Sequence, residues 1–485
     1  MRSVVVAALA TLLITSAVAF AQSSGSNLER FNRQQQLQQY ELDTRMQANE
    51  DIPPSQRLLL DYGGYFSPQY FSIDDSSNDN HGLREYDLVG YLRANFDGAN
   101  EVFLRGRVQY NDYNPGDSFD GFGSRVVNPD FDRAYYKFDL QQYESAYNGK
   151  QLDGDITFQG GRDLVYWGNG LTLAQVVDGV TPSFSWKNWT LTTVAGVTPT
   201  RTVDFEPDRP AFDYDTRRGF YGGLLSVAVG PAHPYVFGLI QRDYNVNHNL
   251  SVVGPITTRY SYNSDYLGAG ISGSLSDHFR YGVEAVYESG DGLSSSSIVE
   301  GFVLTQATQY RKNIIAYAAD AKLDYVPLDT HQTRVTLEGI VGTGDADRGL
   351  TNTTLNGNAG GSDDRAFNGF GLVSTGLAFG APVSNLEVIR LGASTFPLSS
   401  YSASKRLQLG ADFYIFDKEN ANAPIDEATN KGAKFLGWEP DVYVNWEMAS
   451  DVTLALRYGA FVPNTSAFVS DAVRQFFYAG VTFAF

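Results

Sequence analysis

The chain ends, from Val473 to Phe485, in the sequence VRQFFYAGVTFAF. Aromatic and small apolar side chains occupy every second position of its last part, at Phe477, Ala479, Val481, Phe483 and Phe485. A period of two places these side chains on one face of a β-strand. The end of the chain therefore predicts a strand with one apolar, aromatic-rich face.

Segments of the same kind recur from about residue 56 onward. Between Val102 and Tyr110, one face carries Leu104 and Val108, whereas the other carries Arg105 and Arg107. Such segments are about ten residues long, which is the length that a tilted strand needs to cross a bilayer. The apolar faces often end in Tyr, Phe or Trp, as expected of residues at a membrane interface. Repetition of this pattern predicts membrane-spanning strands.

The terminal strand resembles the closing strand of bacterial outer-membrane proteins, which the barrel-assembly machinery reads, here through Phe485. We therefore expect an all-β fold, a transmembrane antiparallel β-barrel of about 16–18 strands over residues 56–485. Barrels of that size enclose an aqueous channel. The expected location is the outer membrane of a Gram-negative-type bacterium, with outer-membrane lipid around the wall.

The N-terminal region differs from the rest of the chain. Residues 1–21 have a charged start at Arg2, an apolar core and an Ala-x-Ala end, which indicates a cleavable secretory signal. Residues 22–55 are rich in Gln and predict a short periplasmic helical segment that Pro53 and Pro54 end. This leader either plugs the barrel, touches peptidoglycan or is simply solvated, and the sequence favours the solvated leader.

Composition excludes several classes of protein. The 485 residues include 48 Gly, 30 Tyr and 31 Phe but no Cys, which excludes thiolate zinc sites, iron–sulfur ligation and disulfide scaffolds. The formal net charge of −19 argues against a nucleic-acid-binding protein, which carries a basic surface. A mean hydropathy of −0.26 excludes a bundle of membrane-spanning helices but fits a barrel, in which only alternate residues face lipid.

Two segments resemble the alginate-export family of outer-membrane barrels. The first runs from Phe158 to Gly168 and includes Gly161-Arg162-Asp163, followed by Asp178-Gly179-Val180. The second comprises residues 436–446, with Leu-Gly-Trp-Glu-Pro-Asp at its start, and residues 456–463. The resemblance covers about a fifth of the chain. It implies a monomeric barrel of about 18 strands that passes an anionic polysaccharide through an Arg-lined lumen.

Basic side chains on the polar faces of the expected strands are the candidate substrate contacts. They are Arg93, Arg105, Arg107, Arg133, Lys137, Arg162, Arg242, Arg280, Lys322 and Arg457. Arginines at a constriction would select anions through a focused positive potential. Alternatively, they pair with carboxylates on neighbouring strands and merely solvate the lumen. The expected partners in that case are Asp139, Glu284, Asp320, Asp324, Glu439 and Asp441.

Catalytic and metal-binding motifs are weak. The five His residues are dispersed, and the sequence contains neither a Gly-x-Ser-x-Gly elbow nor a phosphate-binding loop of the Walker type. The acidic run from Asp74 to Asp79 lacks the ligand spacing of an EF-hand. We therefore expect no enzyme activity, no cofactor and no dedicated metal site. Residues 198–217 and 343–368 are candidate plugs because of their length.

Three functions stay open from the sequence. The first is a passive channel that carries a hydrophilic, anionic saccharide, as the resemblance implies. The second is a general small-solute porin, for which the net acidity predicts a weak preference for cations. The third is a structural or adhesive barrel whose acidic loops bind partners or cations. The sign of the charge on the lumen surface is the observation that separates them.

Overall fold

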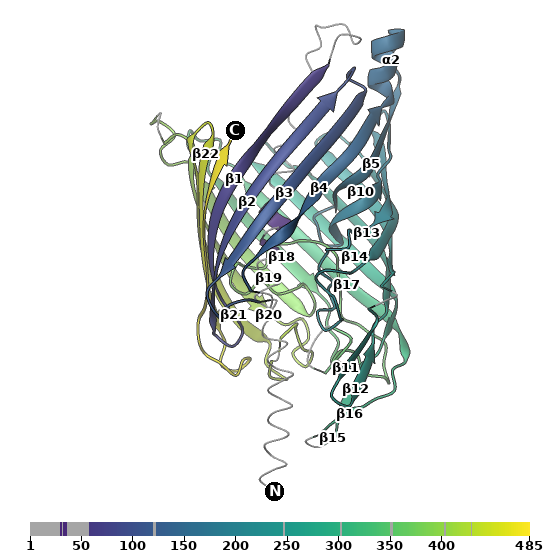
Figure 1. Cartoon of the computed structure of the whole chain (residues 1–485), viewed down its shortest axis with the longest axis vertical. Helices are drawn as coiled ribbons and strands as arrows, with labels where there is room; N and C mark the ends of the chain where they lie inside the picture. Colours follow the sequence, from purple (N-terminus) through teal and green to yellow (C-terminus); the bar gives the residue numbers. More distant parts are fainter. Residues whose placement is uncertain are drawn as a thin grey trace.

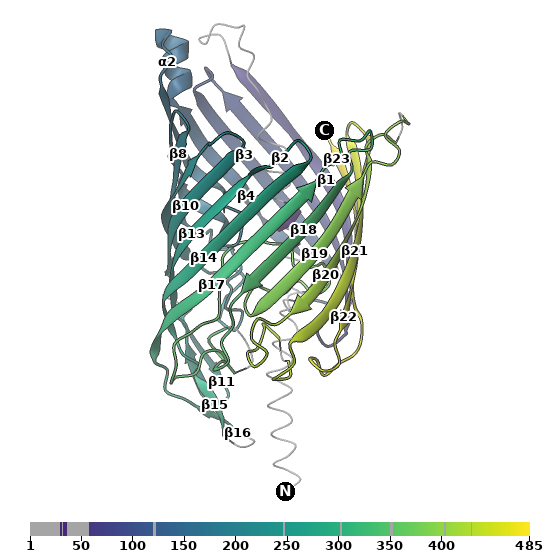
Figure 2. The same ribbon diagram turned by 180° about the vertical axis from the view of Figure 1, so that it is seen from behind.

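The structure is a computed structural model, and it describes residues 30–31, 33–35, 58–119, 123–245, 248–300, 303–349, 353–401, 404–427 and 429–485. Long strands inclined to the barrel axis form a closed wall, and the ladder between β1 and β23 completes it (Figures 1 and 2). The wall has 18 strand positions, all paired antiparallel. Because β6 and β7 both pair with β5 and with β8, they share one position. The expected all-β, closed barrel is confirmed.

The wall strands follow one another around the barrel in chain order. They are β1 (Leu59–Asp74), β2 (Asn80–Asn95), β3 (Asn100–Tyr113), β4 (Arg125–Asp139), β5 (Gly154–Trp167), β6 (Leu173–Val180), β7 (Ser183–Trp186), β8 (Trp189–Val197), β9 (Arg218–Val227), β10 (Ala232–Asp243), β13 (Tyr262–Ser274), β14 (Phe279–Leu293), β17 (Arg311–Tyr325), β18 (Arg334–Gly342), β19 (Leu386–Thr395), β20 (Leu407–Asp417), β21 (Phe435–Ala449), β22 (Val452–Pro463) and β23 (Arg474–Ala484).

Two small hairpins and the helix α2 (Leu140–Asn148) lie outside the wall in the part of the chain after residue 58 that the structure describes. The hairpins are β11 (Leu250–Val253) with β12 (Ile256–Arg259), and β15 (Ser297–Glu300) with β16 (Val303–Gln306). Helix α2 joins β4 to β5 at the opposite end of the barrel (Figure 1). Asp139 caps its first turn, and Gly149 ends it with a φ of 63°, a left-handed conformation that glycine adopts without strain. Within the described residues, no helix is long and apolar enough to cross a bilayer.

Connection lengths orient the barrel in the membrane. The turns at the α2 end are mostly short, such as residues 187–188 and 450–451, whereas the opposite end carries the long connections 198–217 and 343–385. Outer-membrane barrels have short periplasmic turns and longer extracellular loops. The α2 end, where Leu59 begins β1 and Phe485 ends the chain, is therefore the periplasmic end.

Alternation along the strands separates an inner from an outer face. In β3, Leu104 and Val108 are exposed outward, whereas Arg105 is only 5% exposed and faces the lumen. The closing strand behaves in the same way, with Phe477 and Phe483 outward and Phe476 and Tyr478 buried inside. The faces that the sequence predicts for β3 and β23 are therefore confirmed.

Aromatic side chains form two belts on the outer face. The belt toward the extracellular end includes Tyr70, Tyr86, Tyr110, Tyr317, Trp438, Tyr458 and Phe477. The belt toward the periplasmic end includes Phe158, Phe184, Trp186, Trp189, Phe279, Tyr325 and Phe483. Two aromatic girdles around an apolar band are what a barrel presents to the two interfaces of a bilayer. The outer wall is thus a membrane-facing surface.

Candidate functional site: a lumen crossed by inserted segments

The lumen wall formed by β2 to β5 carries arginines that are paired with carboxylates. Arg107 contacts Asp87 at 2.6 Å and Glu85 at 3.2 Å, and Arg93 contacts Glu101 at 2.8 Å. Further along, Arg105 pairs with Asp132 at 2.8 Å and Arg133 with Asp163 at 2.7 Å. Each guanidinium is matched by at least one acidic group on the same or a neighbouring strand. These four arginines therefore follow the alternative in which basic residues pair with carboxylates on neighbouring strands. Their partners differ from those that the sequence suggested.

Four more of the candidate basic residues also face the lumen. Lys137 lies opposite Glu101 in the β3–β4 ladder, and Arg280 lies opposite Asp324 in the β14–β17 ladder. Lys322 shares the inner face of β17 with Asp320 and Asp324, while the Arg457 guanidinium donates to Asn445 Oδ1 at 2.6 Å. No ion pair to a carboxylate is recorded for these four within the described parts of the chain.

Arg162 and Arg242 lie on the outer face, contrary to the sequence expectation. Arg162 lies on the same face of β5 as the exposed Phe158, and Arg242 lies on the same face of β10 as the exposed Ile240. Arg162 pairs with Asp178 at 2.6 Å and with Asp130 at 3.0 Å, and Arg242 pairs with Asp265 at 2.7 Å. These ion pairs hold neighbouring strands together without contributing to the lumen surface.

Arg162 marks the point where β5 leaves the wall. The β4–β5 ladder joins residues 134–139 to residues 157–162, and no rung of it is recorded for residues 125–133. The Arg162 guanidinium donates to the Phe131 carbonyl at 2.8 Å, in the part of β4 that pairs with β3 but has no ladder to β5. Pro129, which has no N–H to donate, lies in the same part of β4.

Beyond this fork, the β5–β6 hairpin bends into the lumen and reaches the far wall. The Asn169 backbone N–H donates to Glu284 Oε2 at 2.8 Å, and its side-chain Nδ2 donates to Asp320 Oδ2 at 2.8 Å. Tyr235 donates to the same Glu284 oxygen at 2.6 Å. Gly168 has a φ of 58°, and a Cβ there would lie 1.6 Å from Glu284 Oε2. Only glycine fits this tip.

The long connection between β18 and β19 enters the lumen within its described residues 353–385. Phe370 accepts a hydrogen bond from Ala174 and donates one to Thr172, which adds an isolated parallel bridge to the β5–β6 hairpin. Further along, Glu439 accepts the backbone N–H groups of Ala378 at 2.7 Å and Phe379 at 2.8 Å. These contacts lie just beyond residues 343–368, the candidate plug that the sequence identified by length. Within that range, the Asn368 N–H donates to Glu288 on β14 at 2.8 Å.

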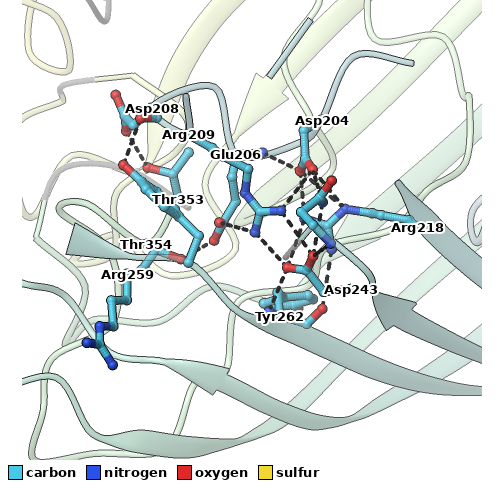
Figure 3. Close-up of polar contacts among 12 residues, drawn as sticks. Asp204, Glu206, Asp208, Arg209, Arg218, Asp243, Arg259, Tyr262, Thr353 and Thr354 are labelled. Carbon is cyan, nitrogen blue, oxygen red and sulfur yellow. Dashed lines mark hydrogen bonds and ion pairs between the residues drawn. The ribbon is translucent and has the colours of Figure 1, made fainter. Parts of the chain in front are cut away.

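The second candidate plug, residues 198–217, is anchored by a buried cluster of charges at the outer end of the lumen (Figure 3). Arg209 contacts Asp243 at 2.6 Å and Glu206 at 3.4 Å, and Arg218 contacts Asp204 at 2.6 Å. All five side chains are 6% exposed or less. Such a cluster is stable only when each charge is paired, as it is here.

The same cluster joins the two inserted connections to each other. Thr353 donates to Asp208 at 2.9 Å, and the Thr354 hydroxyl donates to Glu206, as Figure 3 shows. Burial raises the pKa of Glu206 to about 7, and the neighbouring Arg209 opposes that rise. Three carboxylates face two guanidinium groups in the cluster, so a protonated Glu206 balances the charge. The contact between the two connections therefore depends on one carboxyl group that titrates near neutrality.

The opposite wall of the lumen, from β14 to β21, is acidic. Its inward carboxylates are Glu284, Glu288, Asp320, Asp324, Glu338, Asp412, Glu439, Asp441 and Glu447. Its inward basic groups are Arg280, Lys312, Lys322, Arg334 and Arg390. Counted as ionised, nine acidic groups against five basic ones give this side a formal negative charge, whereas the β2–β5 side is balanced. The sequence did not single out Asn169 or Glu206, and it suggested Glu284 only as a partner of lumen arginines. All three act through contacts between distant segments.

The fold and the inner surface define an outer-membrane β-barrel with an obstructed, polar lumen. No family model and no curated protein matches the chain. Among solved structures, it is similar to Pseudomonas aeruginosa OccK11 (OpdR), with a TM-score of 0.50 and 9% identity over 88% of this chain and 95% of that one. OccK9 (OpdG) of the same organism gives a TM-score of 0.50 and 11% identity over 88% and 98%.

At these identities, the likeness concerns the barrel fold. The protein accordingly resides in the outer membrane of a Gram-negative-type bacterium.

Proposed function

We propose that the protein is a passive outer-membrane channel for small hydrophilic solutes. The observation that carries this proposal is the narrowing of a polar lumen by segments from three places in the chain: the β5–β6 hairpin, residues 198–217 and residues 343–385. A barrel of this size encloses an aqueous channel, and inserted segments reduce the cross-section that is left for solutes. Movement would follow a concentration gradient.

An anionic polysaccharide, which the resemblance to the alginate-export family implies, fits the inner surface less well. Four of the ten candidate basic residues are neutralised by carboxylates in the wall, and Arg162 and Arg242 face outward. The β14–β21 side carries an excess of negative charge. An acidic or mixed lumen repels a polyanion and favours the small-solute porin with a weak preference for cations.

Planar-bilayer recording of the purified protein under a salt gradient tests this proposal. We expect a stable conductance with a reversal potential of the sign that weak cation selectivity produces. A strongly anion-selective channel would favour the saccharide exporter, and a folded barrel without conductance would favour the structural or adhesive barrel. The variant Glu338→Gln, on the acidic side, is expected to reduce cation selectivity. Its matched control is Glu387→Gln, a carboxylate on the outer face of β19 that pairs with Lys434 at 3.2 Å.

Liposome swelling with uncharged sugars of increasing size gives a second measurement. We expect mono- and disaccharides to enter and long oligosaccharides to be excluded, because the inserted segments limit the cross-section. Entry of long oligosaccharides at similar rates would contradict the small-solute proposal even if the channel conducts ions.

A further inference from the structure

A short piece of the N-terminal leader lies inside the lumen, where a solvated leader was expected. Phe31 is 6% exposed, and its ring lies 5.8 Å from that of Phe71, 5.6 Å from that of Phe476 and 4.6 Å from that of Tyr478. These three rings belong to β1 and β23 and face inward. Burial of one aromatic side chain among three others is a substantial apolar contact.

Polar contacts on either side of Phe31 fix the segment in place. The Arg30 guanidinium donates to the Gly380 carbonyl at 2.5 Å and to the Val373 carbonyl at 3.4 Å. Gln35 donates to the Tyr478 hydroxyl at 2.9 Å. Arg30 thus binds residues 343–385, while Phe31 and Gln35 bind the wall. The segment lies between the largest inserted connection and the β1–β23 side of the barrel.

The contacts of Phe31 lie near the extracellular end of the barrel. Phe71 lies three residues before Asp74, at the extracellular end of β1, and Phe476 lies near the start of β23 at the same end. The β1 strand begins at Leu59 at the periplasmic end. The segment that contains Phe31 therefore binds at the outer end of the lumen, although the chain that follows it enters the wall at the periplasmic end.

Inserted segments contact the wall directly on other sides of the lumen. Residues 373–380 contact the β20–β21 side through Ser374 and Glu439, and Asn169 contacts the β14–β17 side. On the β1–β23 side, Arg30, Phe31 and Gln35 make the contacts between the central connection and the wall. Removal of these three side chains would leave a gap between residues 373–380 and β23.

We propose that the segment around Phe31 is a tethered plug, held in an aromatic pocket of β1 and β23, that restricts the channel in its resting state. The inference rests on the proposed function, since a plug restricts only what conducts. The pocket recognises an aromatic side chain preceded by a cation, because the rings receive Phe31 and the carbonyls of residues 373 and 380 receive Arg30. Release of the segment widens the path along the β1–β23 side.

The test compares single-channel conductance of the mature protein with that of Phe31→Asp and Arg30→Ala. An ionised side chain is not accommodated among three rings, so we expect Phe31→Asp to increase the fraction of time in the larger conductance state by at least about tenfold. Arg30→Ala should give a smaller increase in the same direction. The control is Phe96→Ala, an exposed aromatic residue at a periplasmic turn. A heat-dependent shift in gel mobility identifies the folded barrel in every case.

A second readout does not require conductance. Because the chain contains no Cys, Gln35→Cys provides a single thiol, and a bulky polyethylene-glycol maleimide probes it in detergent-solubilised, folded protein. We expect slow labelling of Gln35→Cys, fast labelling of Tyr214→Cys in the exposed part of residues 198–217, and fast labelling of Gln35→Cys when Phe31→Asp is added.

The outcomes separate this inference from the proposed function. Conductance that is the same in wild type and Phe31→Asp, or fast labelling of Gln35→Cys alone, overturns the plug and leaves the channel intact. Absence of conductance in every folded variant overturns the channel and the plug together. Slow labelling with a conductance that rises on release supports both.

Discussion

The two sides of the lumen use charged residues in different ways. On the β2–β5 side, Arg107 and Arg133 are paired with carboxylates of the same wall. On the β14–β21 side, Glu284 and Glu439 accept backbone N–H groups from segments that come from elsewhere in the chain. The first arrangement stabilises the wall itself, whereas the second attaches the inserted segments to it. Acidic residues on one face of a barrel therefore do not by themselves define selectivity, because some are structural anchors.

The largest effect is expected at Glu439, which holds two buried N–H groups. Glu439→Ala leaves the amides of Ala378 and Phe379 without an acceptor, at a cost of about 3–6 kcal/mol in the docking of residues 374–380. Hydrogen exchange measured by mass spectrometry should show faster exchange at these amides. The control is Glu85→Gln on the balanced side, which should leave that exchange unchanged. If the amides of Ala378 and Phe379 exchange as slowly in Glu439→Ala as in the wild type, the distinction between carboxylates that anchor inserted segments and carboxylates that pair with arginines is wrong.

A pH dependence is expected next, at the contact between the two inserted connections. The pKa of Glu206 is about 7 in the folded protein against an ordinary value of 4.5. Because the folded value is the higher one, the stabilisation is complete below about pH 4.5 and is lost as the pH rises through about 7, a loss of up to about 3 kcal/mol. Hydrogen exchange of residues 353–358 should therefore accelerate between pH 5 and pH 8, conditions chosen to cover that range.

The matched variant for this prediction is Glu206→Gln, which cannot ionise. We expect its exchange, corrected for the intrinsic effect of pH, to be constant over the same range. If the wild-type protein behaves in the same way as Glu206→Gln, the docking of the two connections does not depend on this carboxyl group.

A smaller effect is expected at the tip of the β5–β6 hairpin. Asn169→Ala removes the hydrogen bond to Asp320 but keeps the backbone contact to Glu284, so we expect a loss of about 1–3 kcal/mol in docking and a higher conductance. Asn188→Ala serves as the control, since its side chain bonds the Ala228 carbonyl at a periplasmic turn. An unchanged conductance in Asn169→Ala would show that the hairpin tip does not limit the path.

The smallest effect is expected on the outer face. Arg162→Gln interrupts ion pairs whose carboxylates, Asp130 and Asp178, are 47% and 40% exposed, so we expect a cost of about 1 kcal/mol or less. Arg133→Gln interrupts a buried pair and should cost more. Unfolding in detergent by urea compares the two variants. A larger loss of stability for Arg162→Gln than for Arg133→Gln would mean that this wall depends more on the ion pairs at the fork between β4 and β5 than on the lumen pairs.

The sequence was sufficient to predict the barrel wall but not the contacts of the segments that lie inside the lumen. Alternation predicted the closed barrel, the faces of β3 and β23 and the aromatic belts, because those properties depend on the period of a strand alone. Arg162 is an even number of residues from the outward Phe158, and Arg242 is an even number of residues from the outward Ile240. The same alternation, applied to each residue, would therefore have placed both arginines on the outer face. By contrast, the contact of Asn169 with Glu284 joins residues 115 positions apart and follows from the bend of a hairpin.

The position of the aromatic pocket has a consequence for the order of assembly. Phe71 and Tyr478 are cross-strand partners in the ladder between β1 and β23, which are the first and last strands to be synthesised. The pocket for Phe31 therefore does not exist until the barrel has closed. The segment around Phe31 can bind only after the last strand, β23, has paired with β1. Its binding therefore indicates that barrel closure is complete.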